Sequence, residues 1–168
     1  MTIFTSGNEA ARGDLPNILV DAVLPVLDEI AQDQAASNFA GTYESEQSNS
    51  SVTISTGGLN TGLRVTAWTS QGVNLLNELT ALFGDFVWRI VPNQLHVGNG
   101  KVSFTSYYAV PEGPPVNGTF FWTCPGWVDV DEITYGNVPL GQMEFDVDSG
   151  KATTVNVRAL RQTLTRQS

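Results

Sequence analysis

The feature that most constrains this chain is an alternation of apolar and polar residues with a period of two, which begins near Phe39 and continues to about residue 159. Val52 and Ile54, for example, alternate with serine and threonine. Such alternation sends successive side chains to opposite faces of a β-strand. Turn-forming residues separate the runs, as at 98–100 and 148–150. Short strands joined by tight turns predict an antiparallel meander.

We expect strands near residues 51–55, 63–68, 86–91, 94–97, 102–108, 119–124, 127–135, 141–147 and 153–159. The side chains predicted to point inward are Val52, Ile54, Leu63, Val65, Val102, Phe104, Tyr108, Phe120, Trp122, Val128, Val130, Met143, Phe145, Val147, Val155 and Val157. A meander of about eight strands with one apolar face satisfies its edges by rolling into a barrel, and a sandwich is the competing arrangement. We also expect a bulge after Asp131, where the parity of the apolar positions changes.

Two segments have helical spacing instead. Residues 14–37 carry apolar side chains at intervals of three and four, which predicts an amphipathic N-terminal helix that Pro25 kinks but does not end. Residues 73–83 predict a short inserted helix that ends at Gly84. The expected fold class is therefore mainly β (α+β): an antiparallel barrel of about eight strands with two helices.

Charge and composition exclude several classes of function. The 168 residues include 8 Lys and Arg against 17 Asp and Glu, and the formal charge of −9 disfavours binding to nucleic acid. Cys124 is the single cysteine and His96 the single histidine, so the sequence predicts no metal site and no cofactor. It contains no apolar run long enough to span a membrane and no recognisable secretion signal.

Three segments resemble a known family. They are Phe39-Ala40-Gly41-Thr42-Tyr43, residues 57–68, and Phe121-Trp122-Thr123-Cys124-Pro125-Gly126-Trp127. Together with the proline-bearing helix, they are similar to the C-terminal, lipocalin-like domain of fungal β-lactamase-like serine hydrolases, which are relatives of penicillin-binding proteins. The resemblance implies that residues 1–37 correspond to the last strand and helix of a hydrolase domain. It implies a lipocalin-like barrel over residues 38–168.

The catalytic motifs of that family are absent. Lys101 and Lys151 are the two lysines, and neither follows a serine at the Ser-x-x-Lys spacing. There is also no Gly-x-Ser-x-Gly motif. Esterase or lactamase activity is therefore not expected of this chain.

Candidate functional residues come from the aromatic and titratable side chains. His96 and Tyr108 are the candidates for proton transfer, since histidine titrates near neutral pH. An apolar ligand inside the barrel would contact Phe104, Tyr108, Phe120, Trp122 and Phe145, although small barrels are often filled by their own side chains. Arg64 and Trp68 are expected to form an outward pair capable of a stacked contact.

Two functions remain open. The first is a noncatalytic barrel that binds an apolar small molecule or a protein. The alternative is a cofactor-independent cyclase or isomerase that folds an apolar substrate of fungal natural-product biosynthesis into a reactive shape. The apolar stripe of the N-terminal helix must cover the barrel, cap one mouth, or pair with a second copy in a homodimer. The expected location is cytoplasmic if Met1 is the native start and secreted if the chain is cut from a longer parent.

Overall fold

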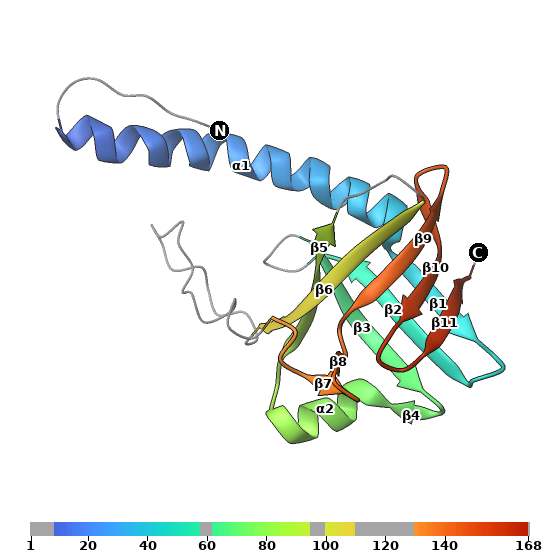
Figure 1. Ribbon diagram of the computed structural model, residues 1–168. Coiled ribbons are helices and arrows are strands. Elements are labelled where there is room, and N and C mark those ends of the chain that lie inside the picture. Colours follow the sequence, from blue (N-terminus) through green and yellow to red (C-terminus); the bar gives the residue numbers. More distant parts are fainter. Residues whose placement is uncertain (1–8, 58–61, 95–99, 110–129, 168) are drawn as a thin grey trace.

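The computed structural model describes residues 9–57, 62–94, 100–109 and 130–167. A long helix, α1 (Glu9–Phe39), leads into a β-barrel, and its N-terminal half projects well beyond the barrel (Figure 1). A second, short helix, α2 (Leu75–Phe83), lies at the opposite end of the barrel. We call these the α1 end and the α2 end.

The barrel is a closed antiparallel sheet. Its strands follow the order β2-β1-β11-β10-β9-β6-β5-β3, and β2 also pairs with β3, which closes a circle of eight strands. The short strand β4 pairs with the end of β3. This confirms the barrel and excludes the sandwich. The bounds are β1 Gly41–Ser45, β2 Ser50–Thr56, β3 Leu63–Ser70, β4 Val73–Asn74, β5 Val87–Gln94, β6 Lys101–Ala109, β9 Met143–Asp148, β10 Lys151–Val157 and β11 Gln162–Arg166, with a separate hairpin of β7 (Thr134–Tyr135) and β8 (Val138–Pro139).

The first and last strands of the chain are neighbours. Tyr43 of β1 pairs with Arg166 of β11. The Arg166 guanidinium also donates to the carbonyl oxygens of Asn38, at 3.4 Å, and of Ala40, so it connects the last strand to the end of α1. The pairing of β1 with β11 therefore also fixes the point at which the helix enters the barrel.

The interior contains most of the side chains that the alternation assigned to it. Phe120, Trp122 and Val128 lie outside the described residues, and Tyr108, Val130 and Val147 are half-buried. The remaining inward predictions are buried and therefore confirmed: Val52, Ile54, Leu63, Val65, Val102, Phe104, Met143, Phe145, Val155 and Val157.

The prediction that Trp68 points outward beside Arg64 is wrong. Trp68 is only 1% exposed, whereas Arg64 is half-buried and its Nε donates to the Ser55 hydroxyl at 3.4 Å. The cause is a β-bulge: Thr53 pairs with Ala67 but Ile54 pairs with Val65, so β3 has one extra residue at this point. An extra residue reverses the parity of the strand beyond it, which turns Trp68 into the barrel.

The strand expected over 127–135 is also incorrect where the structure describes it. Residues 130 and 131 lie in a turn, residues 132 and 133 have no regular secondary structure, and a short strand begins only at Thr134. Asp131 has φ of 57°, in the left-handed region, which interrupts the extended backbone. The change in the parity of the apolar positions after Asp131 predicts a bulge, but the structure has a turn at this place.

The helices match their predictions in kind. The α1 helix runs through Pro25 without ending, and it is longer at both ends than expected. For α2, the Asn74 side chain accepts a hydrogen bond from the Asn77 amide at 3.1 Å, and Gly84 ends the helix with φ of 83°. These two caps position α2 across the end of the barrel.

Candidate functional site

The two ends of the barrel contain different aromatic clusters. At the α1 end, Phe39 packs edge-on against Phe104 and Phe145, with ring centroids 5.1 and 5.4 Å apart. Phe104 and Phe145 also contact each other at 5.2 Å, and they are 3% and 0% exposed. These two predicted ligand-contacting residues therefore belong to a packed core that the last residue of α1 covers.

Tyr43 joins the same core. Its hydroxyl donates to the Phe39 carbonyl at 2.7 Å, and its ring contacts Phe145. Burial raises the pKa of Tyr43 to about 12, although the nearby positive charge of Arg166 acts in the opposite direction. A buried, neutral phenol whose proton is committed to a main-chain carbonyl is a structural group, so the α1 end offers no proton-transfer chemistry through Tyr43.

The α2 end has a second aromatic cluster, which we call the α2-end cluster, formed by Trp68, Phe83, Phe86, Trp88 and Tyr108. Tyr108 pairs with Trp88 across β6 and β5. Its ring stacks on Phe83 with centroids 6.4 Å apart and meets Phe86 edge-on at 5.9 Å. Phe86 contacts Trp88 at 5.9 Å, and Trp88 contacts Trp68 at 5.4 Å. A continuous series of ring contacts thus leads from α2 into the barrel.

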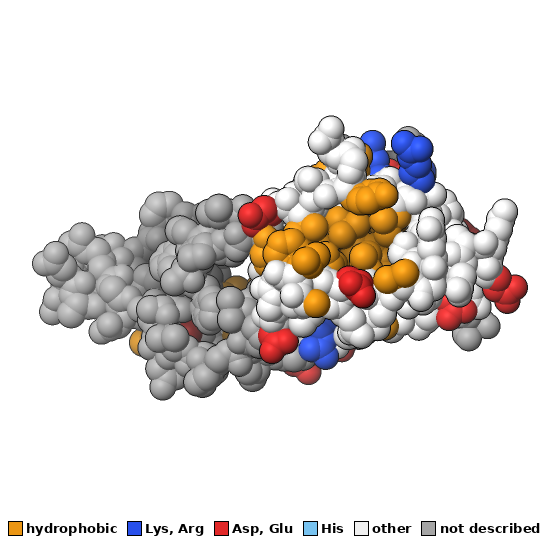
Figure 2. All heavy atoms as spheres, turned by 90° about the horizontal axis from the view of Figure 1, so that it is seen from below, with side chains coloured by type: hydrophobic (Ala, Val, Ile, Leu, Met, Phe, Trp, Pro, Cys, Tyr) orange, Lys and Arg blue, Asp and Glu red, His pale blue; other side chains and the backbone are white. Residues whose placement is uncertain are grey.

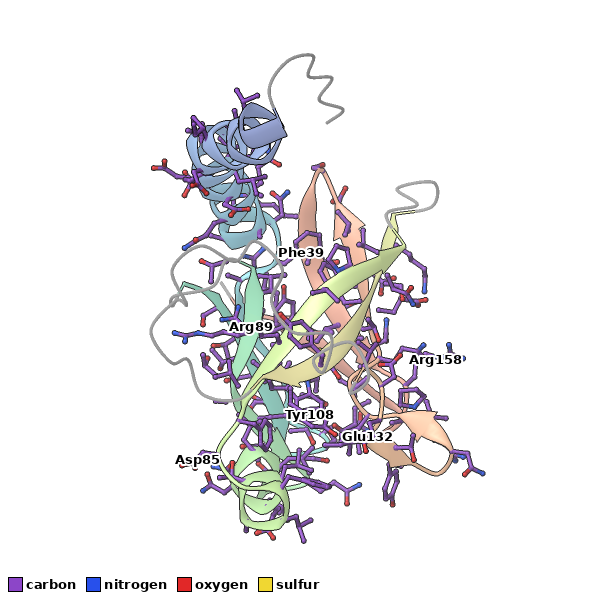
Figure 3. The ribbon with its side chains drawn as sticks, turned by 90° about the vertical axis from the view of Figure 1, so that its left-hand side faces the viewer. Phe39, Asp85, Arg89, Tyr108, Glu132 and Arg158 are labelled. Atoms are coloured by element: carbon purple, nitrogen blue, oxygen red, sulfur yellow. The ribbon has the colours of Figure 1, made fainter. Side chains whose placement is uncertain are left out.

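A carboxylate meets this cluster at Tyr108. The Tyr108 hydroxyl donates to Oε2 of Glu132, which directly follows the turn at residues 130 and 131, and the two side chains point toward one another in Figure 3. Glu132 is exposed and Tyr108 is half-buried. The predicted proton-transfer residue Tyr108 is therefore held by a carboxylate at the barrel's rim, whereas the other candidate, His96, lies outside the described residues, as do Phe120 and Trp122.

Buried polar atoms in this cluster and at the neighbouring Asp131 have no hydrogen-bond partner among the described residues. Within the described part of the chain, the buried Nε1 atoms of Trp68 and Trp88 have no hydrogen-bond acceptor, and one buried carboxylate oxygen of Asp131 has no donor. Buried donors in folded proteins nearly always have a partner, so such groups call for an explanation. Trp88 is also tightly packed, since a Cβ added at Gly141 would lie 3.1 Å from its Cζ2 atom.

The outer surface at the α2 end is apolar. Val73, Leu82, Phe83 and Tyr135 are 51, 75, 55 and 64% exposed, and all belong to α2 or to strands at this end. Figure 2 views the molecule from this side and shows apolar side chains gathered over its centre, with acidic side chains close by. An exposed apolar patch that adjoins buried aromatic rings is typical of a binding surface.

A polar depression of about 220 Å³ lies elsewhere, beside the turn between β1 and β2. It is lined by Glu44, Ser45, Glu46, Asn49, Ser50, Ser51 and Thr69. Behind it, the Gln162 amide donates to the hydroxyls of Ser50 and Ser70, both at 3.0 Å. These bonds stabilise the closing strands, and the depression shares no residue with the α2-end cluster.

Within the described ranges, no group of three or more His, Cys, Asp or Glu side chains is arranged to hold a metal ion. Nor does any helix there have the length and apolarity needed to cross a bilayer.

Residues 31–168 match a protein family described as the beta-lactamase-like-like C-terminal domain. The chain belongs to this family. A curated relative, the "Probable hydrolase clz13" of Cochliobolus lunatus, is 28% identical over 179 aligned residues, which cover 93% of this chain. The chain spans only 28% of the length of that relative. No solved structure matches the chain.

The region that matches the beta-lactamase-like-like C-terminal domain family begins inside α1. The exposed apolar residues of α1 from Ile18 to Ile30 precede that region, while Ala35 and Phe39, which pack against the barrel core, lie within it. Sequence reasoning identified Tyr108 but not its partner Glu132, nor Phe83 and Phe86, because only the α2 helix and the turn at Asp131 bring these residues together.

Proposed function

We propose that this β-lactamase-like C-terminal domain is a noncatalytic interaction module, and that α1 packs against a β-lactamase-like catalytic domain. The exposed apolar stripe of α1 carries this proposal. Ile18, Leu19, Val26, Leu27 and Ile30 are between 37 and 62% exposed.

The stripe faces away from the barrel. On a helix with 3.6 residues per turn, Leu19, Val26, Leu27 and Ile30 lie within about 100° of one another, and Ile18 lies about 80° beyond them. The opposite side carries half-buried residues: Leu24, Asp28, Gln32, Ala35 and Phe39. Fully burying one such side chain stabilises by about 1.5 to 3 kcal/mol. Because the five are roughly half-exposed, covering them is worth on the order of 5 kcal/mol.

Two further observations support a catalytic domain as the partner. The chain lacks both serine-hydrolase motifs, and a relative named as a probable hydrolase is much longer than this chain. A stripe that precedes the family region is well placed to contact a preceding domain.

The test measures binding by isothermal titration calorimetry between this chain and the Cochliobolus lunatus relative from which the matching region has been deleted. Leu27→Asp and Ile30→Asp should abolish binding, since each buries a charge in the interface. Ala31→Asp, at an exposed position outside the stripe, is the matched control and should bind like the wild type.

The same variants test the homodimer that we also consider. If the catalytic portion does not bind but sedimentation equilibrium detects a dimer of this chain that Leu27→Asp dissociates, the stripe's partner is a second copy. If neither complex forms, the interaction role of α1 is wrong.

The hydrogen bond between Tyr108 and Glu132 favours the second candidate, a cofactor-independent cyclase or isomerase. A phenol beside a carboxylate and aromatic walls is able to pass a proton to an apolar substrate. Incubation with a panel of polyene metabolites, followed by mass spectrometry and chromatography, tests this. Product formation that Tyr108→Phe removes, with an unchanged melting temperature, would support catalysis.

A further inference from the structure

The unsatisfied indole groups of Trp68 and Trp88 are the starting point. The two side chains are 1% and 2% exposed, and their ring centroids are 5.4 Å apart. Neither Nε1 has an acceptor within the part of the chain that the structure describes. Leaving a donor buried without a partner costs free energy that an acceptor of suitable size would recover. Two such donors on touching rings therefore indicate a place where an acceptor binds.

The ring contacts provide a route from the surface to these donors. Phe83 is exposed within the apolar patch at the α2 end, and it stacks on Tyr108. Phe86 contacts both Tyr108 and Trp88. An apolar molecule that displaces the rings of Phe83 and Phe86 thus reaches the indole of Trp88 while remaining in contact with aromatic surface throughout.

The charges at this end restrict the class of molecule. Glu132 holds the Tyr108 hydroxyl at the rim, and Asp85 lies near the same end in Figure 3. With a formal charge of −9 on the chain, a carboxylate or phosphate ligand would be repelled. These charges therefore favour a neutral oxygen as the acceptor.

We propose that the α2-end cluster binds a neutral, ring-sized apolar molecule with a carbonyl, ether or hydroxyl oxygen, and that Trp88 or Trp68 donates its indole N–H to that oxygen. Phe83, Phe86 and Tyr108 supply the apolar walls. This site is at the opposite end of the barrel from α1 and does not depend on the proposed role of that helix.

The first test compares a ketone with its hydrocarbon counterpart on the wild-type chain. The probes are 2-decalone and decalin, and binding is followed by the indole resonances in a ¹⁵N–¹H correlation spectrum, with Trp68 and Trp88 assigned from single Trp→Phe variants. We expect 2-decalone to shift one of these two resonances downfield and to bind about five-fold more tightly than decalin, as one additional hydrogen bond implies. Equal affinities, no binding of either probe, or indole resonances of Trp68 and Trp88 that do not move would each overturn the proposal.

Variants then test the location. Trp88→Phe keeps the aromatic body but removes the donor, and Phe83→Ser removes the outermost wall; each should weaken 2-decalone binding about five-fold or more. Leu27→Ser on α1 is the matched surface control and should leave the affinity unchanged. If Trp88→Phe does not fold, the ketone and hydrocarbon comparison on the wild type still decides. An affinity that Leu27→Ser lowers and Phe83→Ser does not would place the probe on α1 and refute the site.

Discussion

Gly141→Ala should be among the most destabilising single substitutions in this barrel. A Cβ at position 141 would lie 1.5 Å from the Ser106 hydroxyl oxygen, 2.2 Å from Ser106 Cβ and 3.1 Å from Trp88 Cζ2. Atoms cannot approach so closely, so β6 or the main chain at 141 has to move. Overpacking a buried site costs about 1 to 3 kcal/mol, and an overlap this severe belongs at the upper limit. For a chain of this size, about 3 kcal/mol lowers the melting temperature by roughly 10 °C.

Urea unfolding followed by circular dichroism measures this cost, and a second substitution identifies its source. Ser106→Gly removes both of the closest atoms, at a cost of about 1 kcal/mol for a glycine inside a strand. In that background, Gly141→Ala should cost at most about 1 kcal/mol, which gives a coupling free energy of about 2 kcal/mol. The reasoning is refuted if Gly141→Ala alone costs less than about 1 kcal/mol, or if the two substitutions are simply additive.

Three further outcomes are expected. Because burial raises the pKa of Tyr43 to about 12 in the folded chain, the unfolded chain loses its proton first as the pH rises, so stability should fall between about pH 10 and 12. Tyr43→Phe should remove the part of this decline that Tyr43 causes, and base titration by circular dichroism of both proteins checks it. Arg166→Met should cost about 2 kcal/mol in urea unfolding, since it deletes charged hydrogen bonds to main-chain carbonyls at the end of α1. A cost below about 0.5 kcal/mol would count against that. Lys101→Met should leave the urea midpoint unchanged, because its bonds to Glu144 and Asp146 are on the surface, and a clear loss would contradict this.

Local alternation predicted much of the architecture. It predicted an antiparallel barrel and most of its interior, because a period of two directly reports which face of a strand is apolar. The prediction of inward and outward side chains failed where a strand departs from the regular period of two. The extra residue in β3 is invisible in the alternation, so Trp68 was assigned to the wrong face.

The last strand was missed for a different reason. Three of its five residues share the parity of the core, and two of these, Gln162 and Arg166, are polar. Gln162 is nevertheless buried, because the hydroxyls of Ser50 and Ser70 accept hydrogen bonds from its amide. A strand whose inward face depends on partners 112 and 92 residues away in the sequence has no local apolar pattern to recognise.

The candidate site was only partly predictable. Tyr108 was identified from its type and parity, but the α2-end cluster depends on the placement of α2 and on the turn at Asp131. Phe104 and Phe145, which were grouped with Tyr108 on parity alone, contact Phe39 at the other end. The alternation shows which side chains of a strand face the interior, but it does not show at which end of the barrel they lie.

The pairing of β1 with β11 has a consequence during synthesis. The strand that starts at Gly41 gains its second neighbour only when the residues up to Arg166 have been made. Until then a nascent chain has two unpaired sheet edges, which are prone to pair with other chains. Contacts between such distant parts of a sequence also form slowly. A premature stop that removes only β11 should therefore yield aggregated protein and not a slightly shortened barrel.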